Sequence, residues 1–527
     1  MTVIASLGQT TLAASVPVPS SLPAASSLAQ TGSVPSPTPS SSTTVTLSQA
    51  NPAPALVYLP PPAQPVWETQ SADAATKLMA QNFSASTLAG RLQGLGQTLL
   101  EQLGGGGGDF SQSVYLPTGN AVPSSALKSV TQSILHTSAD NQISLDVTTR
   151  SGATVQITLD SQGNGLAAAV TVTGGTLTDA DRSALLKLAG GFQDAIDGLT
   201  ADPPALNLDG LVQFDPTVLA SVDLHASVDV SGQGAQTVDF HADDQQRSVK
   251  ASGPLGTVQV NVDMSNPTLL GSADQQARAL GNYLQQFDAA RSRGDGNAEL
   301  MSMFSDAFKA LNSHYAVNPA QPAASQSITL GDTDRSMLTG LADFSASITQ
   351  ANQSLNPMKP GEVDGFAYQV SQHTAIQAGG RLNYTVNQTQ QSQLHASFHR
   401  TLQPGDTLSL TGDKQSQNYY YYQIDDSAQS QATIAYAKGK LVQATLNQSA
   451  SESTRVQKYV MGDLEADTTT PYQQAWSQNL LDLLDSSQQS SPGMSSQANR
   501  QALLSRINDL VALPSSPGQL ADKQPAR

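Results

Sequence analysis

Residues 142–173 read QISLDVTTRSGATVQITLDSQGNGLAAAVTVT, and apolar and polar residues alternate along this stretch. The alternating apolar positions are Ile143, Leu145 and Val147, then Val155, Ile157 and Leu159, then Leu166, Ala168, Val170 and Val172. Because successive side chains of a strand point to opposite faces of a sheet, a period of two indicates strands with one buried face. The turn sequences RSG and DSQGNG separate the three runs. The stretch therefore predicts a three-stranded antiparallel meander.

A helix is predicted directly after this meander. TDAD at 178–181 matches a capping box, in which the Thr178 side chain accepts from the backbone N–H near Asp181 and Asp181 reaches back. The apolar stripe that follows, at spacings of three and four, consists of Leu185, Leu188, Phe192, Ile196 and Leu199. Gly190 and Gly191 each cost about 1 kcal/mol of helix stability relative to alanine, so we expect a close neighbour or a kink there.

A second alternating stretch covers residues 220–263. The order meander, helix, meander predicts an α+β domain at 109–265, with the helix against one face of antiparallel sheet. DVTTRSGATVQITL in the first meander resembles DVSGQGAQTVDFHA in the second. A duplication that relates 142–173 to 220–263 is therefore left open.

Helical patterns precede and follow this predicted domain. Residues 67–108 predict a helical segment and a glycine linker, with a helix over Ser71–Leu103 that ends at five consecutive glycines. Residues 266–358 predict a helical hairpin and a spacer. The hairpin follows a capping signal at Ser272, is broken at RSRGDGN, and is followed by a short helix at 334–349.

The C-terminal part of the chain returns to alternation and then to helical spacing. Residues 359–470 predict an antiparallel β-sheet domain of six to eight polar strands with one apolar face. Residues 471–513 predict C-terminal helices, and 514–527 a disordered tail. The helical stripes are Tyr472, Trp476, Leu480 and Leu484, then Leu504, Ile507 and Val511.

Composition excludes several classes of function. The 527 residues include no cysteine, which removes disulfides, thiolate nucleophiles and cysteine-ligated metals. The net charge is −17 and no dense cluster of Lys and Arg occurs, so nucleic acid binding, which needs phosphate neutralisation, is not expected. No run approaches 18 consecutive apolar residues, so we expect no transmembrane segment.

Residues 1–66 contain no charged residue; the first acidic residue is Glu68 and the first basic residue is Lys77. Sequence so rich in Ser, Thr, Ala and Pro buries too little apolar surface to offset its ordering entropy, and predicts a disordered segment. It lacks the basic start and continuous apolar stretch of a cleavable signal peptide. This start, with the acidic, cysteine-free body, resembles proteins exported by bacterial flagellar or type III machinery, which implies an exported rather than a cytoplasmic protein.

The glycine run at 104–108 fails both phosphate-binding templates. A dinucleotide fingerprint that starts at Gly104 needs glycine at 109, where Asp109 stands, and a P-loop needs Gly-Lys-Ser/Thr at 109–111. A helix C-cap that runs into a flexible linker fits better, because glycine favours the left-handed cap position.

His395 and His399, in HASFHR, have a spacing that would suit a metal site on a helix. On a strand the same spacing separates them by roughly 13 Å, and alternation of Leu394, Ala396 and Phe398 favours a strand. We therefore predict a solvent-facing row of residues. No HExxH zinc motif occurs.

Two pairs of adjacent aspartates, a loop-like sequence at Asp160 and a run of four tyrosines are further candidate sites. Asp243-Asp244 and Asp425-Asp426 are predicted at turns, where paired carboxylates are mostly solvated turn formers. Asp160 opens DSQGNG, which a hairpin turn explains better than a calcium loop, because Thr171 replaces the glutamate of the twelfth position. In a strand, Tyr419–Tyr422 would place two rings on each face, for core packing or for an exposed binding surface.

The expected fold class is α+β, with antiparallel meander sheets and packed helices in several domains after a long disordered N-terminal segment. No catalytic, cofactor-binding or metal-binding residue is assigned, and no cofactor is expected. The first hypothesis is a non-enzymatic structural or interaction protein, exported without a cleavable signal, that contacts a protein partner through the sheet at 365–464. The alternatives are a cytoplasmic bacterial scaffolding or regulatory protein and, from the abundance of Asp alone, a carboxylate-based hydrolase.

Overall fold

The structure is a computed structural model that describes residues 63–523, apart from 118–122, 231, 233, 316–327, 329 and 487–495. Its strands are β1 (Val66–Trp67), β2 (Phe110–Tyr115), β3 (Asn141–Thr149), β4 (Thr154–Gln162), β5 (Gly165–Thr173), β6 (Leu219–Val228), β7 (Gln236–Asp243), β8 (Gln246–Gly253), β9 (Gly256–Asp263), β10 (Asp343–Gln350), β11 (Gly365–Ala378), β12 (Tyr384–Thr401), β13 (Tyr419–Ala437), β14 (Lys440–Val460) and β15 (Asp463–Asn479). The predicted disordered segment 1–66 lies outside the described residues except for its last four positions.

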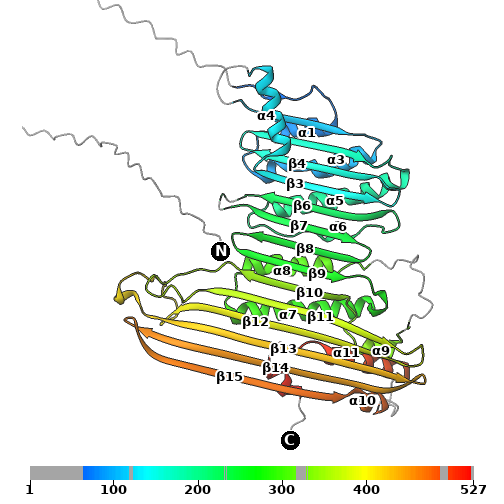
Figure 1. Cartoon of the computed structure of the whole chain (residues 1–527), viewed down its shortest axis with the longest axis vertical. Coiled ribbons are helices and arrows are strands. Elements are labelled where there is room, and N and C mark those ends of the chain that lie inside the picture. Colours follow the sequence, from blue (N-terminus) through cyan, green and yellow to red (C-terminus); the bar gives the residue numbers. More distant parts are fainter. Residues whose placement is uncertain are drawn as a thin grey trace, which may run out of the picture. The chain divides into compact units, whose positions relative to one another are not determined.

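All these strands form one sheet, in the order β1-β2-β5-β4-β3-β6-β7-β8-β9-β10-β11-β12-β13-β14-β15. From β6 onward each strand pairs with the next strand of the sequence, and adjacent strands are antiparallel (Figure 1). The predicted meander at 142–173 is confirmed as β3, β4 and β5. Antiparallel strands with short turns need no crossover, which is why alternation along the chain becomes neighbouring strands in space.

Helices cover one face of this sheet. The described helices are α1 (Ala74–Asn82), α2 (Leu88–Leu92), α3 (Leu95–Gly104), α4 (Ser125–Thr137), α5 (Asp179–Leu199), α6 (Asp209–Val212), α7 (Ala273–Gly294), α8 (Ala298–Leu311), α9 (Asp332–Ser336), α10 (Leu480–Ser486), α11 (Ser496–Val511) and α12 (Pro517–Lys523). Figure 1 shows α3, α5, α7, α8 and α11 behind the strands, and we call this the covered face. Helix α4 packs on the opposite face, where its Leu135 is buried with Tyr115 and Ala167.

The two predicted helix N-caps, at Thr178 and Ser272, are confirmed, and one of the two glycines within α5 has a close neighbour. Thr178 and Asp181 form a capping box at the start of α5, and Ser272 accepts from the backbone N–H of Gln275 at the start of α7. Helices α7 and α8 form the predicted hairpin. At Gly191 a β-carbon would lie 2.6 Å from the backbone carbon of Gly210, so a close neighbour, and not a kink, explains this glycine.

The glycine run ends α3, as a C-cap. The N–H of Gly105 donates to the carbonyl of Glu101 at 2.9 Å, and Gly106 has a φ of 100°, which only glycine adopts readily. Arg182 of α5 donates to the carbonyl of Leu103 at 2.6 Å. The run therefore packs against α5 before β2 begins at Phe110.

Two helix predictions are wrong. The segment 334–349 contains helix α9 only as far as Ser336, and then β10, in which Phe344, Ala346 and Ile348 alternate toward the core. Tyr472 and Trp476 lie in β15, and helix α10 begins only at Leu480. A spacing of four fits a helix, but it also keeps two residues on one face of a strand, so this stripe could not separate the two structures.

The structure differs from the sequence-based predictions in three further respects. The predicted tail at 514–527 contains helix α12, with Pro517 and Leu520 buried. Helix α4 and strand β2 were not predicted. Strands from the predicted domains 109–265 and 359–470 belong to the same sheet, because β10 joins β9 to β11. The domain boundaries themselves stay a prediction.

A row of buried polar side chains connects the C-terminal end of helix α11 to the covered face. Gln390 Nε2 and Ser430 Oγ both donate to the carbonyl of Val511 at 2.9 Å. Gln448 Nε2 donates to the carbonyls of Leu510 at 3.0 Å and Ala512 at 2.8 Å. The last carbonyls of a helix have no partner within the helix, so these strand side chains satisfy the end of α11 and fix its position.

Candidate functional site

The face of β9–β15 opposite the helices carries rows of neutral polar side chains. One row runs through register partners Gln259, Ser347, Gln369, Gln393, Ser427, Ser451 and Gln473. The next row runs through Asn261, Ser345, Ser371, Gln391, Gln429 and Ser449. Neighbouring strands are about 4.8 Å apart, so amide and hydroxyl groups repeat at that spacing. We call this surface, made by the two rows, the open polar face.

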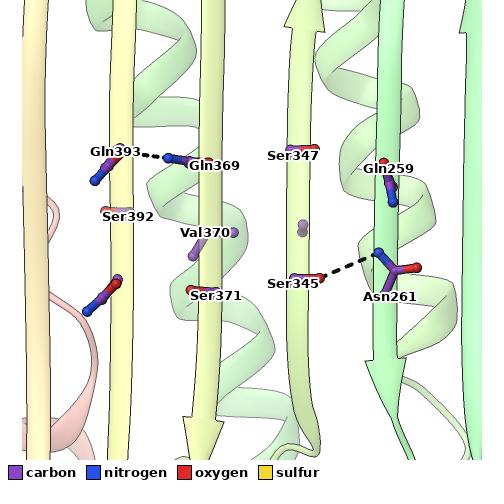
Figure 2. A pocket seen from close by; sticks show the side chains of 11 residues that line it. Gln259, Asn261, Ser345, Ser347, Gln369, Val370, Ser371, Ser392 and Gln393 are labelled. Atoms are coloured by element: carbon purple, nitrogen blue, oxygen red, sulfur yellow. Dashed lines mark hydrogen bonds between the residues drawn. The ribbon is translucent and has the colours of Figure 1, made fainter.

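A shallow hollow of about 360 Å³ lies in the middle of the open polar face, over β9–β12. Figure 2 shows its side chains standing on four strands, with the helices behind the sheet. Gln369 Nε2 donates to Gln393 Oε1 at 2.5 Å, and Asn261 Nδ2 reaches Ser345 Oγ at 3.5 Å. All the residues that line the hollow are uncharged.

The chemistry of this face follows from its residue types. Glutamine, asparagine and serine side chains each both donate and accept hydrogen bonds. Gln259, Gln369, Gln391 and Gln393 are exposed, so their amides are available to a partner. The face can therefore match many hydrogen-bonding patterns, while offering neither a large apolar area nor a strong electric field.

The predicted histidine pair lies on this same side of β12, in two different settings. His395 is exposed, and its Nδ1 lies 3.5 Å from Asp425 Oδ1. His399 is buried: its Nδ1 lies 2.5 Å from Asp364 Oδ1 and its Nε2 lies 3.3 Å from Glu362 Oε2. The predicted strand is correct, but His399 is not solvent-facing, because residues 351–364 cover it.

The tyrosine run belongs to the same buried network. Tyr419 and Tyr421 are buried beside His399, and Tyr419 Oη donates to Glu362 Oε2 at 2.6 Å. Burial and then this hydrogen bond raise the pKa of Tyr419 well above its usual range. On the covered face, Tyr422 stacks on Phe398 with ring centroids 5.1 Å apart. The run thus places two rings on each face, as predicted, and packing accounts for both pairs.

A second histidine cluster lies on β6 and β7, on the face of the sheet opposite the covered face. His241 Nδ1 lies 2.6 Å from Asp223 Oδ1, and its Nε2 lies 3.3 Å from Asp243 Oδ2. Burial disfavours the charged imidazole, but the hydrogen bond and charge of Asp223, together with Asp243, outweigh burial and raise the pKa of His241. Sequence reasoning missed this cluster, because the three residues come from two strands.

The predicted acidic pairs do not behave alike. Asp243 ends β7 and Asp244 lies in the following turn, where Asp244 pairs with Arg150 at 2.8 Å. Asp425 and Asp426 are in the middle of β13, so their predicted turn is wrong. Adjacent strand residues point to opposite faces: Asp425 is on the open side, and Asp426 meets Arg293 of α7 on the covered side.

Asp160 was predicted to open a turn, but it lies inside β4 and is buried. Gln142 Nε2 reaches its Oδ1 at 3.3 Å, and its Oδ2 has no hydrogen-bond partner among the described residues. Burial raises the pKa of Asp160 to about 6.

Among the described residues, no group of three or more His, Asp and Glu side chains could hold a metal ion. Comparison with protein families, characterised proteins and solved structures gives no match. The geometry of the site therefore carries the functional argument alone. None of the helices in the described ranges is long and apolar enough to cross a membrane.

Proposed function

We propose that this chain is a non-enzymatic interaction protein that binds a partner through the open polar face. The observation that supports this proposal is the unbroken row from Gln259 to Gln473, across seven strands that carry no helix on this side. Antiparallel sheets commonly keep one face in contact with solvent, and the exposed glutamines of the two rows lie on that face. Here it offers a rigid, hydrogen-bonding platform to another molecule.

The composition of the face limits the kind of binding. Each neutral hydrogen bond contributes only about 0.5–1.5 kcal/mol net, so a partner must make many of them at once. A specific interface buries about 800 Å² on each side, which the strands from β9 to β14 can supply. With no strong charge to steer association, the on-rate and the affinity should depend little on salt.

The absence of cysteine makes a direct test possible, since any introduced thiol is unique in the chain. Single cysteines at the exposed positions Gln369, Gln391 and Ser449 would each carry a photocrosslinker, and Lys187, exposed on α5, gives the control. In a lysate of the cells that produce the protein, we expect each of the three face positions to crosslink to the same partner. We expect no crosslink from position 187. Equal adduct patterns at all four positions, or no adduct from any, would reject the proposal.

Introducing positive charge tests whether the partner binds to this face or to another surface. Gln369→Lys and Gln391→Lys together should abolish the adduct at position 449 without changing the unfolding midpoint, because both side chains are exposed. The matched control is Lys187→Gln. An adduct that survives both lysines would assign binding to another surface.

Export is a separate part of the proposal and rests on the uncharged residues 1–66. A reporter fused to this segment should reach the culture medium only in cells with a functional export apparatus. Retention with and without that apparatus would favour the cytoplasmic scaffolding alternative. The hydrolase alternative stays a hypothesis; Asp425 and Asp426, on opposite faces, cannot act together on one bond.

A further inference from the structure

A cavity of about 220 Å³ lies on the covered side of the sheet, between α7 and strands β12–β14. Its helix wall consists of Gln286, Ala289, Ala290 and Arg293, whose spacing places them on one face of α7. Asp426 and Glu452 line it from the strands, and Ser515, Ser516 and Pro517 form the wall nearest the C-terminus. Ser427 and Ser451 of the open polar face also contribute to the lining, but the carboxylates of their strand neighbours Asp426 and Glu452 point to the opposite side of the sheet.

The charges inside this cavity do not balance. Arg293 binds Asp426 through two hydrogen bonds, of 2.7 Å from Nε and 3.0 Å from Nη2. Glu452 Oε2 lies 4.0 Å from the same Nη2, which is beyond hydrogen-bond distance. Nη2 also donates to Thr454 Oγ1 at 3.0 Å. One guanidinium therefore faces two carboxylates, and its hydrogen bonds go to Asp426 and Thr454 rather than to Glu452.

The environment of Glu452 reflects this deficit of positive charge. Burial raises the pKa of Glu452, Arg293 opposes that effect, and the negative charge of Asp426 reinforces it. A carboxylate in such a place is stabilised by any cation that reaches it.

A second acceptor in the same wall also lacks a partner. Gln286 is 6% exposed, and its Nε2 donates to the carbonyl of Leu513 at 3.0 Å. Its Oε1 is buried with no hydrogen-bond partner among the described residues. Buried acceptors are nearly always satisfied in folded proteins, so this oxygen is available to a donor on a bound molecule.

We propose that this cavity binds a small hydroxylated primary amine, such as an amino sugar or an amino alcohol. An ammonium group donates three hydrogen bonds and carries the missing charge, which suits Glu452 and Gln286. Ligand hydroxyls would meet the serines at 515 and 516. The volume lies below the range of about 300–1,000 Å³ typical of drug-sized ligands, so the ligand is no larger than a single ring.

Titration of the full chain with glucosamine, ethanolamine and glucose by calorimetry tests this proposal. Glucosamine should bind saturably, and glucose, which lacks the ammonium group, at least tenfold more weakly. Glu452→Gln should weaken glucosamine binding at least tenfold, whereas Glu299→Gln, on the exposed first turn of α8, should not change it. Absence of saturable binding by both amines, or equal affinities of Glu452→Gln and the unmodified chain, would overturn the proposal.

A cavity-filling variant protects this test against a general folding defect. Ala289 is exposed at the rim, so Ala289→Trp should narrow the cavity with the unfolding midpoint unchanged. We expect loss of glucosamine binding in this variant. Retained binding would place the amine elsewhere on the molecule. Because crosslinking at the open polar face reports on the other side of the sheet, the two proposals stand or fall separately.

Discussion

His399 Nδ1 lies 2.5 Å from Asp364 Oδ1, and the imidazole has no exposed surface. The same ring contacts Glu362 through its other nitrogen, at 3.3 Å. Removing the imidazole leaves both carboxylates without this buried hydrogen-bond partner, and an unsatisfied buried polar group costs about 1–3 kcal/mol. The residues at 351–364 are therefore held onto β12 by a contact that the fold depends on.

His399→Phe tests this relationship. We expect the free energy of unfolding to fall by about 1–3 kcal/mol through the lost hydrogen bonds, measured by urea titration with circular dichroism. The matched control is His373→Phe, because the His373 side chain is 81% exposed. Equal losses in the two variants would contradict the assignment.

The two glycines in the middle of α5 should respond in opposite directions to alanine. A β-carbon at Gly190 meets no atom within 4 Å, whereas at Gly191 it would lie 2.6 Å from the Gly210 backbone. Gly190→Ala should stabilise the protein by about 0.5–1 kcal/mol through helix propensity. Gly191→Ala should destabilise it, since backbone must move. The change in the thermal unfolding midpoint of each variant tests this prediction. If both substitutions raise the midpoint, or both lower it, the close contact between Gly191 and Gly210 is refuted.

Asp160 should make the protein less stable as pH rises through the weakly acidic range. Its pKa of about 6 exceeds the ordinary 3.8, so the folded state holds the proton more tightly than the unfolded chain. This contribution is present below about pH 4 and is lost by about pH 6, at an upper limit of about 3 kcal/mol. Asp160→Asn should remove the slope and raise stability at pH 7.5. Asp140→Asn, at an exposed position, should leave the slope intact.

His241 should stabilise the folded state when its imidazole is protonated, because Asp223 and Asp243 favour the charged ring. Its pKa is raised above 6.5, so the contribution is fully present below pH 6.5 and is lost as pH rises through the folded pKa. NMR titration of the ring protons should give a midpoint above 6.5, and Asp223→Asn should lower that midpoint. His225, in a pair whose side chains are more than half exposed, gives the comparison: His225→Gln should change stability by less than about 0.5 kcal/mol. An unshifted His241 midpoint in Asp223→Asn would be the contrary result.

Gln390 and Gln391 are neighbours on β12 that face opposite sides of the sheet. Gln390→Met removes the hydrogen bond to the Val511 carbonyl, which keeps Ser430 as a donor. It also leaves the buried Tyr283 hydroxyl and the Leu513 N–H without the acceptor Gln390 Oε1, which costs about 1–3 kcal/mol. Amide exchange in α11 should then accelerate. Gln391→Met, on the exposed side, should leave exchange in α11 unchanged. Equal protection in both variants would show that apolar contacts alone hold the helix.

Local patterns made much of this fold predictable from sequence. Alternation at Ile143, Leu145 and Val147 identified β3, and the Thr178 capping box fixed the start of α5. Such signals work because they depend on neighbouring residues only. The helix predicted from Tyr472 and Trp476 was wrong, because residues four apart share one face of a strand as well as of a helix.

The sites were less predictable, for a physical reason. His399 meets Asp364 and Glu362 only because residues 351–364 fold over β12, and Arg293 meets Asp426 across 133 positions of sequence. A sequence pattern over a few neighbouring residues cannot predict contacts between residues so far apart in the chain. The open polar face is an intermediate case: alternation predicts which residues share a face, but register decides which ones become neighbours.

The order of the strands has a kinetic consequence. From β7 to β15 each strand pairs with its predecessor in the chain, although helices intervene before β10. Each new strand can dock as soon as it is available, with little loop-closure entropy to overcome, and proteins with such local pairing fold faster than those with distant pairing. A chain built this way can assemble progressively from one end, and the last hairpin, β14 and β15, can open without disturbing the first.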